Sequence, residues 1–217
     1  FKPSHLSLVP TQLIRLLREK TPAGLKRILL GGAPVPQSLI EEAAQQGLPV
    51  AASYGMTETA SQIAATAPGA PVTGAGTILP HAEVKISQNN EILIRGASVS
   101  KACTHADGWL HSGDTGRFEN GILFVDGRLD RQFISGGENI QPEQIEQALM
   151  SLKGISQAVV TPVKDSEFGQ RPKAFLDVDW QEEWELLLRK SLPGYMIPIR
   201  FEKLPAGVDF KPKLTDF

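Results

Sequence analysis

Residues 53–61, SYGMTETAS, combine four hydroxyl side chains, an aromatic ring and a single carboxylate in nine positions. The Thr57 hydroxyl can donate a hydrogen bond to a phosphate oxygen. The adjacent Glu58 can bind Mg²⁺, since this ion binds few carboxylates together with phosphates and water. Tyr54 can stack on a purine ring. A solvated loop rich in serine and threonine explains the same residues when they are taken alone, so the segment indicates a magnesium–phosphate site without establishing one.

Two later segments can also contact a nucleotide. In HSGDTG, residues 111–116, Asp114 can accept two hydrogen bonds from a ribose diol, although an Asx turn before a strand explains it as well. In GRLDRQFISGGENIQPEQIE, residues 127–146, Arg128 can reach a phosphate or a sugar. The Ser135-Gly136-Gly137 stretch predicts a flexible loop that allows close backbone approach to a ligand. The alternative is a linker followed by a helix start.

The composition excludes several classes of protein. The 217 residues are 41% hydrophobic and 21% charged with a formal net charge of −2, which gives no basic surface for nucleic acid or an anionic membrane. No apolar run approaches the roughly 20 residues of a membrane span, and the first ten residues lack a signal-peptide pattern. The single cysteine, Cys103, excludes an internal disulfide framework and a cysteine-based zinc site. We therefore expect a cytoplasmic protein.

The hydrophobic pattern predicts three successive regions. Helices and short strands alternate up to about residue 70, which predicts an α/β region whose ligands bind at the carboxyl ends of strands. Short strands then follow one another, with Asn120-Gly121 as a strong hairpin signal, which predicts a small barrel or curled sheet. The last region predicts a small α+β unit. The predicted helices are 8–20, 36–46, 142–152 and 181–192, and the predicted strands are 25–30, 48–53, 82–87, 91–96, 115–119, 122–127, 156–163 and 173–178.

The order and spacing of these motifs carry more information than any one of them. GGAP at residues 31–34, then YGMTETAS, HSGDTG and the 127–146 segment, resemble the adenylate-forming superfamily of acyl-CoA synthetases, luciferases and peptide-synthetase adenylation domains. The resemblance covers essentially the whole chain. Within the superfamily, SLVPTQL, LLGGAPVP, the 127–146 segment and DSEFGQRP are most similar to the o-succinylbenzoate–CoA ligases of menaquinone biosynthesis.

The resemblance implies a partial adenylate-forming fold. Residues 1–129 would be the carboxy-terminal part of the large AMP-binding domain, with an α/β segment at 1–70 and a β subdomain at 71–129. Residues 130–217 would be the small mobile C-terminal α+β domain. The superfamily's loop for the β- and γ-phosphates of ATP is absent and is expected to lie before Phe1. We therefore expect a carboxy-terminal portion with an incomplete active site.

The implied reaction is the ATP-dependent, Mg²⁺-dependent activation of an aromatic carboxylic acid, o-succinylbenzoate, to an acyl-adenylate, followed by transfer to coenzyme A. The implied ligands are ATP or AMP, Mg²⁺, coenzyme A and the acid, with no nucleic acid and no membrane span. One alternative is another aryl- or acyl-CoA ligase or an adenylation domain. An alternative from a different class is a non-catalytic fragment that binds a nucleotide or an acyl group.

The resemblance also assigns roles to individual positions. Thr57 would bind the phosphate of the acyl-adenylate and Glu58 would bind Mg²⁺. Tyr54 would stack on adenine, and Asp114 would bind the ribose diol. The positions implied for the nucleotide are Gly32, Ala33, Pro34, Ser53, Tyr54, Gly55, Met56, Asp114 and Arg128; those implied for the acid are Gly55, Ser61 and Thr77; and those implied for the pantetheine tunnel are Ser135, Gly136 and Gly137, in a loop ending at Glu138.

Two implied positions concern the change between half-reactions. Asp130 stands at the superfamily's hinge, and Arg131 follows it where relatives commonly have an acidic residue. Relatives also have a tail motif, G-K-[IV], whose lysine drives adenylation. The tail here is LPAGVDFKPKLTDF, so Lys211 is the best candidate and Lys213 the second, with no glycine immediately before either.

Overall fold

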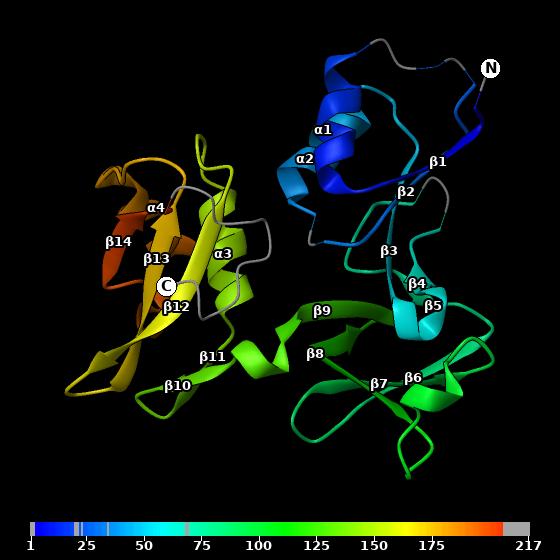
Figure 1. The fold of residues 1–217 in the computed structure, drawn as a ribbon. Coiled ribbons are helices and arrows are strands. Elements are labelled where there is room, and N and C mark those ends of the chain that lie inside the picture. Colours follow the sequence, from blue (N-terminus) through cyan, green and yellow to red (C-terminus); the bar gives the residue numbers. More distant parts are fainter. Residues whose placement is uncertain (1–2, 20–21, 23, 34, 68–69, 206–217) are drawn as a thin grey trace. The chain divides into compact units, whose positions relative to one another are not determined.

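The computed structural model describes residues 3–19, 22, 24–33, 35–67 and 70–205, and the chain divides into two compact units, Phe1–Val125 and Asp126–Phe217. Each unit is described by itself. The expected fold class is confirmed: an α/β region and a β subdomain make up the first unit, and an α+β arrangement makes up the second (Figure 1). The division falls four residues before the domain boundary expected at 129/130, which stays a prediction.

The first unit contains a five-stranded sheet in the order β1-β2-β3-β4-β5. Its first three strands are parallel, whereas β4 and β5 join it antiparallel. Helices α1 and α2 bury Leu13, Leu39 and Ala43 against Ile28 and Leu30 of β2, so their apolar faces form one core with the sheet. The bounds are β1 His5–Leu8, α1 Pro10–Arg18, β2 Arg27–Leu30, α2 Gln37–Gln45, β3 Val50–Met56, β4 Ser61–Ala65 and β5 Thr77–Ile78.

A second, four-stranded sheet in the same unit has the order β6-β7-β8-β9. Asn120 and Gly121 both have positive φ (50° and 78°), which is the backbone of the predicted tight turn between β8 and β9. Ile92, Ile94 and Leu123 from this sheet are fully buried with Ile63 of β4, so both sheets share one core. The bounds are β6 Ala82–Ile86, β7 Glu91–Gly96, β8 Leu110–Glu119 and β9 Ile122–Arg128.

The second unit packs two helices with a three-stranded sheet in the order β12-β13-β14. Ile145 and Leu149 of α3, Leu188 of α4, and Val160 and Leu176 of the sheet are all 0% exposed and form its core. Within the described part of the chain, no helix has the length and apolar character needed to cross a membrane. The bounds are β10 Phe133–Ser135, β11 Glu138–Ile140, α3 Pro142–Met150, β12 Ala158–Asp165, β13 Gly169–Leu176, α4 Glu183–Ser191 and β14 Arg200–Lys203.

In three segments the local structure differs from the loop or turn considered from the sequence. Residues 53–61 are not one loop, because β3 continues to Met56 and β4 begins at Ser61. Residues 111–116 lie inside β8 and form no turn; a register irregularity opposite β7 accommodates Gly113 at φ 69°. The Ser135–Gly137 stretch is a hairpin between β10 and β11, with the two glycines in its turn.

Candidate nucleotide-binding site

Two glycines follow the carboxyl end of β2, beside β3. The Ser53 hydroxyl donates to a backbone carbonyl of β2 at 2.9 Å, and a Cβ on Gly31 would lie 2.9 Å from the Ser53 oxygen. Gly32 has φ 79°, a conformation that favours glycine. The predicted ligand positions Gly32 and Ala33 therefore lie at this strand end, next to Ser53, while Pro34 lies outside the described residues.

The side chains expected to contact adenine and ribose lie together. The Tyr54 hydroxyl on β3 donates to Asp114 Oδ2 on β8 at 2.6 Å, although the two residues are 60 positions apart in the sequence. Both side chains are half-buried. The contact joins the two sheets of the first unit and fixes the direction of the carboxylate, because a short charge-assisted hydrogen bond of this kind is among the stronger ones. Stacking was the only role predicted for Tyr54, so its hydroxyl contact is new.

A short 3₁₀ turn, η1 (Thr57–Thr59), connects β3 to β4 and presents Thr57 and Glu58 to solvent. Thr59 builds this turn. Its Oγ1 accepts the Met56 N–H at 3.1 Å and lies 2.9 Å from the Met56 carbonyl oxygen and 2.6 Å from that of Ser61. Thr59 is 1% exposed, so its hydroxyl, like that of Ser53, serves the backbone. Sequence reasoning missed this role because burial of Thr59 depends on the fold around it.

The Glu58 carboxylate is suited to a magnesium ion held mainly by phosphate and water. Its side chain is exposed, and its backbone carbonyl accepts the Ser100 N–H at 2.8 Å, which fixes the turn. No group of three or more His, Cys, Asp or Glu residues able to hold a metal occurs among the described residues. A lone carboxylate beside a hydroxyl matches the preference of Mg²⁺ for few protein ligands.

The three positions implied for the acid lie on neighbouring strands but not together. A Cβ on Gly55 would lie 2.1 Å from the Ser61 carbonyl oxygen, so packing of β3 on β4 already requires glycine there. Gly55 and Ser61 are therefore adjacent. Thr77 pairs with Ala65, at the other end of β4. At about 3.3 Å per residue, these four positions along the strand separate it from Ser61 by about 13 Å.

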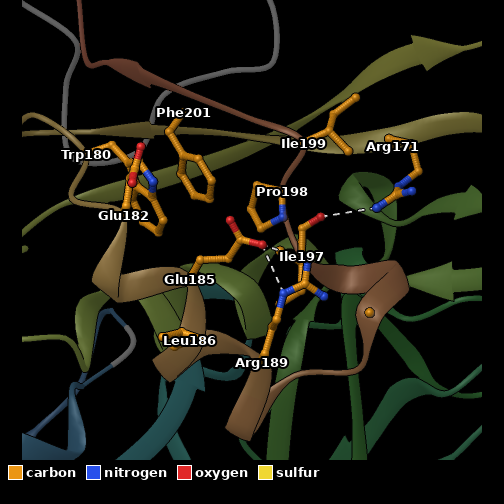
Figure 2. A pocket seen from close by; sticks show the side chains of 11 residues that line it. Arg171, Trp180, Glu182, Glu185, Leu186, Arg189, Ile197, Pro198, Ile199 and Phe201 are labelled. Carbon is orange, nitrogen blue, oxygen red and sulfur yellow. Dashed lines mark hydrogen bonds and ion pairs between the residues drawn. The ribbon is translucent and has the colours of Figure 1, made fainter.

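The second unit contains a hollow of about 710 Å³ beside α4 and β14 (Figure 2). The Trp180 and Phe201 rings, 3.5 Å apart and nearly parallel, line it together with the Glu185–Arg189 ion pair. None of the described positions implied for nucleotide, acid or pantetheine lines this hollow. It is therefore not the site indicated by the motifs.

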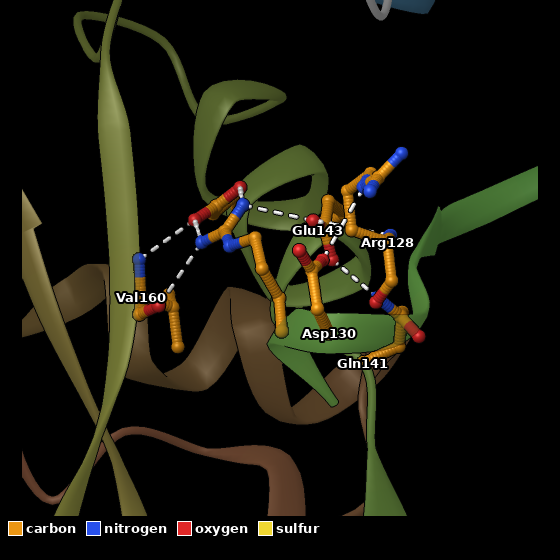
Figure 3. A network of polar contacts seen from close by, with 7 residues as sticks. Arg128, Asp130, Gln141, Glu143 and Val160 are labelled. Atoms are coloured by element: carbon orange, nitrogen blue, oxygen red, sulfur yellow. Dashed lines mark hydrogen bonds and ion pairs between the residues drawn. The ribbon is translucent and has the colours of Figure 1, made fainter. Parts of the chain in front are cut away.

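Arg128 and Asp130 belong to a turn that is fastened to the start of α3 (Figure 3). Arg128 Nε lies 3.3 Å from Asp130 Oδ1. The backbone N–H of Arg128 donates to Glu143 Oε1 at 3.3 Å, and the backbone carbonyl of Arg128 accepts a hydrogen bond from Gln141 Nε2 at 3.0 Å. The Asp130 side chain is 71% exposed. The backbone at Arg128 is thus held within the second unit, and Asp130 projects from the same turn.

Arg131 is the strongest anchor in this turn. Its guanidinium donates to Glu146 Oε1 at 2.6 Å, to Glu143 Oε1 at 2.9 Å and to the Val160 carbonyl oxygen at 3.2 Å. Glu146 also accepts the Val160 N–H at 2.8 Å. Burial raises the pKa of Glu146, and the hydrogen bond from Arg131 only partly opposes that effect. Arg131 therefore has a structural role, because it binds two glutamates of α3.

The loop expected to line the pantetheine tunnel is a tight turn. Gly136 and Gly137 have φ of 57° and 89°, as a two-residue hairpin turn requires. The Gly136 N–H donates to the Phe168 carbonyl at 3.0 Å, and a Cβ on Gly136 would lie 2.8 Å from the Phe168 ring. Ser135 is 1% exposed, and its hydroxyl has no hydrogen-bond partner among the residues that the structure describes. The predicted loop is therefore a two-residue hairpin turn, and its flexibility stays a prediction.

The chain is similar to known proteins in both sequence and fold. Residues 1–102 match the family model described as AMP-binding enzyme. The 2-succinylbenzoate–CoA ligase of Escherichia coli (strain K12) is 39% identical over 215 residues, which are 93% of this chain and 47% of that protein. The o-succinylbenzoate CoA synthetase (MenE) from Bacillus subtilis, solved in complex with the acyl-adenylate intermediate OSB-AMP, has a TM-score of 0.83 at 34% identity, covering 94% of this chain and 48% of that one.

The same Bacillus subtilis enzyme, solved with ATP and a magnesium ion, has a TM-score of 0.84 at 34% identity, again covering 94% of this chain and 48% of that one. The chain thus spans about half the length of the curated relatives it matches. The chain is thus similar to AMP-binding enzymes over residues 1–102, and its fold is similar to that of solved o-succinylbenzoate CoA synthetases, which confirms the expected resemblance. Within that class, the proteins it is similar to are the 2-succinylbenzoate–CoA ligases.

Proposed function

We propose that the protein is an AMP-forming acid–thiol ligase that activates o-succinylbenzoate with ATP and transfers the acyl group to coenzyme A. The observation that carries the proposal is the 2.6 Å contact between Tyr54 and Asp114. It brings the expected adenine and ribose ligands together in the unit that also exposes Thr57 and Glu58. The similarity to 2-succinylbenzoate–CoA ligases supports this acid over others.

In the adenylation half-reaction, Asp114 would accept hydrogen bonds from the ribose hydroxyls, with its carboxylate oriented by Tyr54. The Tyr54 ring would cover one face of adenine. Thr57 would donate to an α-phosphate oxygen, and Glu58 would hold Mg²⁺, which shields the phosphate charge from the incoming carboxylate. Phosphoryl-type transfer depends mostly on positioning and charge stabilisation, and side chains fixed on strands suit that task.

In the thioester half-reaction, a rotation at Asp130 would move Lys211 out of the active site and bring the turn at residues 135–138 into it. The thiol of coenzyme A would approach along this turn. Such domain rotations are a common way to complete a site. The proposed domains meet near this residue, with residues 1–129 forming part of the AMP-binding domain and residues 130–217 the mobile one. Lys211 and Lys213 lie outside the described residues, so Lys211 is assigned from its position in the sequence.

The reaction is tested with protein expressed from its complete gene. Pyrophosphate release is measured with ATP, Mg²⁺ and coenzyme A over a panel of aryl and fatty acids. We expect o-succinylbenzoate to give the highest kcat/KM. Higher kcat/KM for another acid would overturn the substrate assignment, and no acid-dependent pyrophosphate release would overturn the ligase assignment.

The metal role is tested with Glu58→Gln, which removes one negative charge and changes little else. We expect Mg²⁺ affinity in the adenylation assay to fall on the order of tenfold to a hundredfold, as for other changes in the surroundings of a bound metal. The control is Glu83→Gln, an exposed glutamate on β6 paired with Arg95. A Mg²⁺ titration identical to that of the wild type would exclude Glu58 as a ligand.

A further inference from the structure

We infer that Glu91 is a positioning residue for the nucleotide site, because it holds the irregular part of β8 that directs Asp114 toward Tyr54. The identity of the ligand in this inference rests on the proposed function. Glu91 is the first residue of β7 and is only 8% exposed. The motif pattern assigns it no role. A carboxylate this buried requires partners, and both of its oxygens have one.

The two Glu91 oxygens contact β8 just ahead of Asp114. Oε1 accepts the Gly113 N–H at 3.1 Å, and Oε2 lies 3.1 Å from His111 Nδ1. The other ring nitrogen of His111 lies 3.2 Å from Asp107 Oδ2. The Glu91 side chain therefore binds positions 111 and 113 of β8, and the pairing of His111 with a second carboxylate keeps the ring directed at Glu91.

The strand requires such a support because its pairing is interrupted here. Glu91 pairs with Thr115, whereas Leu93 pairs with His111, so β8 has two more residues than β7 in this interval. Gly113, in the middle, has φ 69°. A backbone N–H that leaves the ladder requires another acceptor, and the Glu91 carboxylate supplies it.

A second support acts on Asp114 itself. The Ser112 hydroxyl accepts the Asp114 N–H at 3.0 Å and lies 2.7 Å from the carbonyl oxygen of Ile92 on β7. The Gly113 N–H is thus held by Glu91 of β7, and the Asp114 N–H is held by Ser112 of β8, whose hydroxyl is itself bound to Ile92 of β7. The Asp114 carboxylate, fixed in this way, meets the Tyr54 hydroxyl at 2.6 Å.

The inference is tested by comparing AMP with 2′,3′-dideoxy-AMP, whose ribose lacks the diol, as ligands of the protein expressed from its complete gene. In the wild type, AMP should bind about tenfold to a hundredfold more tightly, as expected for hydrogen bonds to a charged acceptor. Glu91→Met keeps the side-chain length but removes both acceptors. It should lose most of this preference while binding dideoxy-AMP as before. Glu91→Gln, which keeps an acceptor for the Gly113 N–H, should retain it.

Controls separate this inference from the proposed function. Glu83→Met, on the neighbouring strand β6, should leave the AMP preference unchanged. Asp114→Ala should abolish the preference; if it does not, the proposed ribose site fails and the role of Glu91 fails with it. In another outcome, Asp114→Ala abolishes the preference while Glu91→Met lowers the affinity for AMP and for dideoxy-AMP equally, or lowers neither. That result overturns only the role of Glu91. If Glu91→Met does not fold, Glu91→Asp is tested instead with the same two ligands, AMP and dideoxy-AMP. This variant withdraws the carboxylate from β8 by one methylene.

Discussion

Replacing Arg131 with methionine is expected to destabilise the second unit by about 3 kcal/mol. The guanidinium donates to both oxygens of Glu146, to Glu143 and to the Val160 carbonyl oxygen. The side chains of Arg131, Glu143 and Glu146 are 23%, 14% and 11% exposed. Methionine retains the apolar stem but leaves Glu146 buried without its cation. Removing one partner of a buried pair costs about 3–5 kcal/mol, and the residual exposure places this case at the lower end.

The pH dependence provides a second signature. Burial already raises the pKa of Glu146, and loss of Arg131 removes a group that lowers it. The pKa in the folded variant should therefore rise further above its unfolded value of about 4.3. The folded variant then binds a proton that the unfolded chain has released, so its free energy of unfolding falls as pH rises through that window. We therefore expect the free energy of unfolding of Arg131→Met to lie further below that of the wild type at pH 8 than at pH 5.

Amide hydrogen exchange of α3 and β12 measures the effect within the unit concerned. A loss of about 3 kcal/mol corresponds to protection factors about a hundredfold lower. The control Arg189→Met breaks an ion pair that is also short, at 2.7 Å to Glu185, but exposed, so its effect should stay below about 0.5 kcal/mol. Adding Glu146→Gln to Arg131→Met should restore part of the loss. Equal effects of Arg131→Met and Arg189→Met, or a deficit that does not change with pH, would refute the reasoning.

Three further predictions concern packing and the two half-reactions. Gly55→Ala should destabilise the first unit by about 1–3 kcal/mol in thermal unfolding, because its Cβ would lie 2.1 Å from a carbonyl oxygen of β4. The control Gly194→Ala, whose Cβ would have no atom within 4 Å, should have little effect. Asp130→Pro should spare adenylation and reduce thioester formation by orders of magnitude in single-turnover assays; equal losses in both steps would contradict a hinge there. Lys211→Ala should abolish adenylate formation but not transfer from a pre-made adenylate; the same pattern in Lys213→Ala instead would move the catalytic lysine.

The elements with a clear hydrophobic period could be predicted from the sequence. All four helices were expected within three residues of their observed ends, since apolar spacing together with Pro or Gly near the termini marks them. The strands that were not expected are β1, β4, β5, β10, β11 and β14. Strands β1 and β14 each pair in parallel with a strand more than twenty residues away, so their existence depends on a partner that no local pattern reveals. The bulge in β8 resembled a turn in the sequence, because glycines near an aspartate are common both in tight turns and in β-bulges.

The residue types of the candidate site were accessible from sequence, but their partners were not. Tyr54 and Asp114 were both expected to contact the nucleotide, yet the hydrogen bond between them spans 60 positions. Glu91 resembled an ordinary first residue of a strand, and only its burial shows that it needs partners. Arg131 was noticed as a departure from the pattern, and its explanation required α3 and β12 to be in place.

The placement of Tyr54 and Asp114 on different sheets has a consequence for engineering. The positions implied for the acid, Gly55, Ser61 and Thr77, all lie on the five-stranded sheet, whereas Asp114 and its support Glu91 lie on the four-stranded one. Libraries that diversify β4 and β5 in search of a new acid would leave the ribose ligand and its support unaltered. Activation of a different acid could then evolve while the nucleotide is retained, provided that Tyr54, whose hydroxyl reaches across to the other sheet, is kept constant.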